Sequence, residues 1–139
     1  MQAIPLPPIL PEVEPAAWRR WYARLKGTAA RDMLASDAIE DPEQRERYRR
    51  GVAATEAGDL ETAIREFQWL ADNDPGSPLF NLCAAQAFVL FLQRCGWDMG
   101  YSARARRYLL RARRAGASAA RLVQLEKIHR QIVGLAESA

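Results

Sequence analysis

The sequence predicts an all-α fold, a short array of antiparallel helix hairpins with about six helices in 139 residues. Three observations lead to this prediction. Apolar residues recur at spacings of three and four along most of the chain, which is the period of an amphipathic helix. Glycine and proline stand between these stretches, where helices end and begin. No stretch alternates apolar and polar residues for long enough to form a strand.

Composition indicates one soluble globular domain with an uneven charge. Hydrophobic residues make 49% of the chain and charged residues 27%, which argues against a largely disordered protein. Residues 1–36 carry five basic and three acidic groups. Residues 37–74 carry five basic and eleven acidic groups, and residues 75–139 carry ten basic and three acidic groups. This division can steer a charged partner or hold two copies of the chain head to tail.

Residues 1–15 form a proline-rich arm, for which an extended polyproline II conformation is expected. Five prolines and the lack of a basic start argue against a secretory signal. The most apolar stretch, residues 79–92, has fourteen residues and contains Asn81 and Gln86. It is too short to span a membrane and fits a buried helix better. We therefore expect a cytoplasmic protein.

Residues 16–35 are expected to form the first helix. Trp18, Trp21, Tyr22 and Leu25 fall on one face, and Gly27 is a weak point. Two interpretations fit this segment. It can lie on a membrane surface, or its aromatic residues can cover the exposed end of the helical array, and we favour the second.

Residues 41–77 predict two helices. Asp41 suits an N-cap, Pro42 the first helical position, and Gln44 completes a capping-box pattern. Gly58 is expected to close this helix and Asp59 to cap the next, which runs to about residue 72.

Residues 78–117 predict a second pair, and residues 118–139 a final helix. Ser77 and Pro78 begin a helix that reaches about Arg94, Ser102 begins a basic helix, and Gly116 ends it. Ser118 starts the last helix, whose apolar stripe consists of Leu122, Leu125, Ile128, Ile132 and Leu135.

The spacing of small and large residues resembles the tetratricopeptide repeat (TPR), a 34-residue helix–turn–helix unit. Over residues 44–77 the matching positions are Gly51, Ala54, Gly58, Ala63, Phe67, Leu70 and Pro75. The usual Trp and Leu of the first helix are replaced by Arg47 and Arg50. A second unit matches at Ala85, Phe88, Gly100, Ala105, Leu109 and Ala112, with eight extra residues and Ala117 in place of the closing proline. The alternative is a helical bundle whose small residues reflect close packing.

The resemblance implies a concave face lined by the first helix of each unit. That face would carry the groove residues Arg45, Tyr48, Val52, Leu82, Gln86 and Val89. The Lys/Asn clamp of some relatives, which holds a C-terminal carboxylate, is absent at Tyr48 and Val52. An apolar groove favours an apolar partner segment, extended or helical. Alternatively, the N-terminal helix or arm of this chain covers these side chains.

A basic stripe is the second candidate site. At 100° per residue, Arg104, Arg107, Arg111 and Arg114 fall within about 80° of one another on a helix. Arginine suits carboxylates and phosphates. The stripe can be a solvated face, a partner for the acidic stretch 37–74, or a nucleic-acid contact, although no docking motif accompanies it.

Catalysis is not expected from this sequence. His129 is the single histidine, and no acidic or cysteine cluster stands at metal-ligand spacing. Cys83 and Cys95 lie twelve residues apart on one expected helix, about 18 Å, too far for a disulfide, so both should be free thiols. There is no glycine-rich phosphate loop. We expect no cofactor and no metal.

The leading hypothesis is a non-catalytic protein-interaction module, an adaptor or a chaperone. In plan the chain is similar to the small TPR chaperones of bacterial type III secretion, and this resemblance implies an aggregation-prone secreted subunit as partner. Preference for arginine over lysine fits a GC-rich bacterial genome, while the basic C-terminal half departs from those chaperones. The alternatives are a self-assembling homo-oligomer and, less favoured, a basic regulator that binds nucleic acid.

Overall fold

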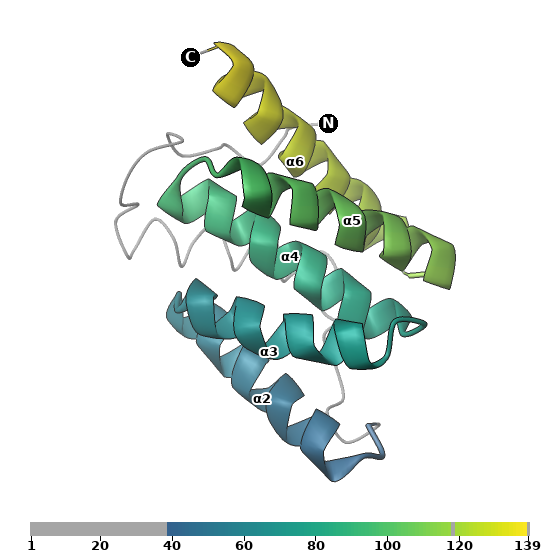
Figure 1. Ribbon diagram of the computed structural model, residues 1–139. Coiled ribbons are helices and arrows are strands. Elements are labelled where there is room, and N and C mark those ends of the chain that lie inside the picture. The colour runs from purple at the N-terminus through teal and green to yellow at the C-terminus, as the bar shows by residue number, and fades with distance from the viewer. Residues whose placement is uncertain (1–38, 118, 139) are drawn as a thin grey trace.

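The computed structural model describes residues 39–117 and 119–138, which form five α-helices and no β-strand (Figure 1). The helices are α2 (Pro42–Ala57), α3 (Leu60–Asn73), α4 (Pro78–Cys95), α5 (Met99–Ala115) and α6 (Ala119–Ser138). The predicted all-α class is confirmed for this part of the chain. The expected arm at 1–15 and helix at 16–35 lie outside the described residues, so the count of about six helices stays a prediction.

Helices α2 and α3 begin and end at the residues that the sequence indicated. The backbone N–H of Gln44 donates a 2.9 Å hydrogen bond to Asp41 Oδ1 at the start of α2. Asp59 Oδ1 accepts an equivalent bond from Thr62 at the start of α3. Gly58 between the two helices has a φ of 79°, a left-handed conformation that favours glycine.

Gly51 allows α2 and α3 to approach each other closely. A Cβ atom at this position would lie 2.6 Å from the ring of Phe67, well inside contact distance. That ring is 1% exposed and meets Tyr48 edge-on, with centroids 6.1 Å apart. Glu66 adds ion pairs to Arg47 at 3.2 Å and to Arg50 at 3.3 Å. Gly51 and Phe67, one small and one large residue, therefore meet across this interface.

Helix α4 is the central helix of the described part. It packs against α3, α5 and α6, and thirteen of its eighteen residues are buried. Ser77 Oγ caps it by accepting a bond from the N–H of Phe80, as the sequence indicated. By length and composition the helix could cross a membrane, but 72% of its apolar window is buried inside the protein. This burial agrees with the expected buried helix.

Helix α5 begins three residues earlier than expected, at Met99 instead of Ser102. The cap is Asp98, whose Oδ1 accepts a 2.9 Å bond from the N–H of Tyr101. An aspartate is at least as good an N-cap as a serine, and Gly100 is tolerated in the first turn because the cap offsets its cost. The helix ends at Gly116, where φ is 85°, as predicted.

Helix α6 packs on α5 and reaches across it to α4. Ser118, its expected first residue, lies outside the described residues. Four members of the expected apolar stripe are buried, namely Leu122, Leu125, Ile128 and Ile132. The fifth, Leu135, is 44% exposed, because the last turns of α6 extend beyond the helices that bury the rest of the stripe (Figure 1).

Candidate partner-docking site

The residues of the predicted groove occupy α2 and α4, and most of them are buried. Tyr48, Leu82, Gln86 and Val89 are at most 3% exposed, whereas Arg45 and Val52 are half-buried. Arg45 is turned back on the chain, since its guanidinium donates to the carbonyl oxygens of residues 39 and 40 at 2.9 and 3.0 Å. A partner bound along this face stays a prediction, and the face does not present an open apolar surface.

Two buried glutamines lie on this face of α4. Gln86 Oε1 accepts a hydrogen bond from the guanidinium of Arg121, a charged residue of α6 that is only 1% exposed. Gln93 lies one turn beyond Val89 and is 2% exposed. Neither amide atom of Gln93 has a hydrogen-bond partner in the described part of the chain. The face therefore holds one polar contact that joins α4 to α6 and one unsatisfied carboxamide.

The predicted basic stripe lies along α5, and its member Arg111 holds α5 to α3. Its guanidinium donates to Asp72 Oδ1 at 3.2 Å and to the carbonyl oxygen of Ala71 at 2.7 Å. The hydroxyl of Tyr108 also donates to Asp72, at 2.8 Å, and burial raises the pKa of this phenol. The acidic stretch 37–74 therefore provides a partner for the stripe within the same chain.

The other three members of the stripe, Arg104, Arg107 and Arg114, are exposed. Arg104 and Arg107 lie over the aromatic rings of Tyr101 and Tyr108, with the guanidinium carbon 5.7 and 5.1 Å from the ring centroids. These contacts fit a solvated basic face held in place by aromatic neighbours. None of these arginines belongs to the lining of the hollow described next.

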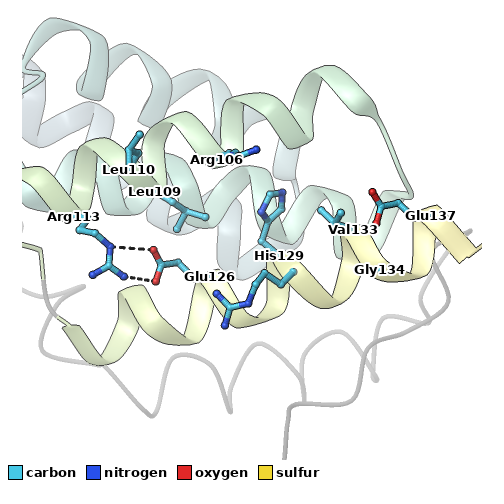
Figure 2. A pocket seen from close by; sticks show the side chains of 10 residues that line it. Arg106, Leu109, Leu110, Arg113, Glu126, His129, Val133, Gly134 and Glu137 are labelled. Atoms are coloured by element: carbon cyan, nitrogen blue, oxygen red, sulfur yellow. Dashed lines mark hydrogen bonds and ion pairs between the residues drawn. The ribbon is translucent and has the colours of Figure 1, made fainter.

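A hollow with a volume of about 710 Å³ lies between α5 and α6 (Figure 2). We call it the α5–α6 hollow. Leu109 and Leu110 line it from α5, and Val133 and Gly134 line it from α6. Leu110 is 47% exposed, so part of this apolar lining is open to solvent.

Charged side chains surround this apolar centre. Arg113 and Glu126 form a two-bond ion pair between the helices at one end, at 3.3 and 2.5 Å (Figure 2). Arg106 on α5 and Arg130 on α6 line the hollow without an ion pair in the described part of the chain. Glu137 lies at the other end. The hollow thus combines an apolar floor with unpaired arginines on both walls.

Ser102 and His129 form a buried hydrogen bond beneath the hollow, with Oγ and Nε2 2.8 Å apart. A hydroxyl and an imidazole at this distance can act as nucleophile and base when a third group orients the imidazole. Here both residues are 8% exposed, and no described acidic side chain is hydrogen-bonded to the ring. We interpret the pair as a link between α5 and α6. The expectation that the chain is not an enzyme stays a prediction.

The His129 pKa makes the attachment of α6 sensitive to pH. Burial, and then the nearby charge of Arg106, lower this pKa below its ordinary value of 6.5. The unfolded chain therefore binds a proton at about pH 6.5, while the folded chain does not until the pH is lower. We expect the free energy of unfolding to fall as the pH is lowered below 6.5.

The measurement is urea unfolding of the wild type and of His129→Asn between pH 7.5 and 5.5. Asparagine can keep a bond to Ser102 and does not titrate, so the variant should lose less stability across this range. Equal losses in the two proteins would show that His129 does not cause the pH dependence.

No short pattern in the sequence indicates the α5–α6 hollow. Arg106, Arg113, Arg130 and Gly134 were not singled out, because their meeting depends on how two helices far apart in sequence are placed. The one local indication of this site is Gly134, a glycine inside a strong helical pattern. Cys83 and Cys95 are free thiols as predicted, the first buried and the second exposed. The described residues contain no group of three potential metal ligands.

Comparisons of the chain with protein-family models, with curated proteins and with solved structures find no match.

Proposed function

We propose that the chain is a non-catalytic protein-interaction module, built as a TPR-like array, that holds a helical segment of a partner protein in the α5–α6 hollow. The TPR-like arrangement is supported by the contact of Gly51 with Phe67 and by the order of packing. Each helix from α2 to α6 packs against the next one along the chain. An adaptor or chaperone role follows from such a surface without any chemistry of its own.

The observation that carries the proposal is the open hollow itself. Its apolar residues come from two helices that α4 and the Arg113–Glu126 ion pair hold in place. Exposed apolar surface enclosed by polar residues is typical of a binding site on a soluble protein. The buried groove residues on α4 offer no comparable opening.

A helix is the shape that fits this site. Two adjacent helices form a groove into which the side-chain ridges of a third helix can pack. An amphipathic partner would place residues at i, i+3, i+4 and i+7 along the groove. In a repeat array, a further helix would pack against the last two helices, here α5 and α6. The partner helix would occupy that position.

Gly134→Leu provides the direct test of the proposed function. A side chain added at Gly134 meets no atom within 4 Å, so the variant should fold, yet the leucine would project into the hollow. We expect the tagged full-length protein to lose its stoichiometric partner in pull-downs from the native cell. Ala120→Leu is the matched control, because Ala120 is exposed on α6 outside the hollow. If Gly134→Leu keeps the partner, the docking site is elsewhere.

Self-assembly is the second candidate, because Leu110, Val123 and Leu135 are exposed on α5 and α6 and the chain divides into acidic and basic parts. Light scattering on the purified wild type separates the two functions. If the wild type is a homo-oligomer and Gly134→Leu dissociates it, the hollow binds a second copy of the chain instead of a partner protein.

A further inference from the structure

We propose that the segment held in the α5–α6 hollow is an acidic amphipathic helix. This inference rests on the proposed function and adds the charge of the partner. It follows from three features of the described residues, namely the arginines without an ion pair, the glycine in α6, and the apolar floor of the hollow.

The arginines of the hollow differ in whether they are already neutralised. Arg113 is paired with Glu126 through two bonds. Arg106 and Arg130 line the hollow from opposite walls and have no ion pair in the described part of the chain. Carboxylates on the two flanks of an apolar helix stripe would meet one arginine on each wall. Arginine suits this role because its planar fork can bind a carboxylate through two hydrogen bonds.

Gly134 indicates close approach by another chain. Glycine inside a helix costs about 1 kcal/mol relative to alanine, so its presence calls for a packing reason. Here the residue is exposed, and a Cβ atom at its position would meet nothing within 4 Å. The described helices therefore do not require glycine at this position, whereas a partner backbone laid against α6 would.

The apolar floor of the hollow favours a peptide over nucleic acid. Leu109, Leu110 and Val133 offer a phosphate backbone no favourable contact. For a helix, these apolar residues provide the floor, and Glu137 can pair with a basic residue near one end of the partner.

The probes are two capped peptides of about 18 residues, long enough to form a helix. Both carry leucine along one helical face, and the flanks are glutamate in one peptide and lysine in its twin. Fluorescence anisotropy with the full-length protein gives the affinities. We expect the glutamate peptide to bind at least about tenfold more tightly than the lysine peptide. This difference in affinity should decrease as salt is added.

The charge-reversed variant Arg106→Glu/Arg130→Glu should prefer the lysine peptide instead. The control Arg104→Glu/Arg114→Glu removes the same charge from exposed positions of α5 outside the hollow and should keep the glutamate preference. Circular dichroism establishes that each variant is folded.

Three results would overturn the inference. If both peptides bind equally and Gly134→Leu blocks both, the hollow binds a helix whatever its charge. The proposed function then holds, and the inference about charge is wrong. If a DNA duplex binds through Arg106 and Arg130 while neither peptide does, the partner is a nucleic acid. If Gly134→Leu leaves peptide binding unchanged, the proposed function itself is wrong.

Discussion

Replacing Phe67 with alanine is expected to lower the free energy of unfolding by about 3–5 kcal/mol. The ring is 1% exposed and fills the space that Gly51 leaves between α2 and α3. Its removal would leave a cavity that the two helices cannot close, because ion pairs from Glu66 hold α2 to α3. Urea unfolding followed by circular dichroism measures this change.

Leu110→Ala is the control for the Phe67 experiment, because Leu110 is 47% exposed. This substitution should lower the free energy of unfolding by only about 0.5 kcal/mol or less. A loss below about 1 kcal/mol for Phe67→Ala would mean that the α2–α3 contact is not part of the stable core.

The two glutamines of α4 are expected to respond in opposite directions to replacement by leucine. Gln86→Leu removes one hydrogen-bond acceptor of the buried Arg121 guanidinium and should cost about 3 kcal/mol, because a buried charge loses a hydrogen bond. Gln93→Leu removes a carboxamide that is buried without a partner in the described chain, and should stabilise the protein by about 1 kcal/mol.

The glutamine comparison is internally controlled, since both substitutions are the same and both sites are at most 2% exposed on one face of α4. Thermal and urea unfolding of the two variants provide the measurement. Destabilisation of similar size in both would show that the Arg121 contact adds nothing specific.

Local signals predicted the helices well because their causes are local. Asp41 and Asp59 cap helices through bonds to residues three positions away, and Gly58 and Gly116 end them in the left-handed conformation. The start of α5 was misplaced because Asp98 and Ser102 are both competent caps. Which of the two residues caps α5 depends on the path of the chain after α4, and no short sequence pattern specifies that path.

The candidate site was harder to predict because its contacts are distant in sequence. His129 meets Ser102 across 27 residues, and Arg121 meets Gln86 across 35. The resemblance to the tetratricopeptide repeat implied that Leu82 and Val89 share one face, but such a resemblance does not tell what covers that face. The same limit applies to Leu135, which continues a buried stripe and is nevertheless exposed.

Site-specific photo-crosslinking tests whether a partner protein lies in the α5–α6 hollow. Leu110, in the α5–α6 hollow, is replaced by p-benzoylphenylalanine, and Ala120, outside it, serves as the control position. After illumination in the native cell, we expect one covalent adduct with a different protein from position 110 and none from position 120. An adduct between two copies of this chain, or equal labelling from both positions, would contradict it.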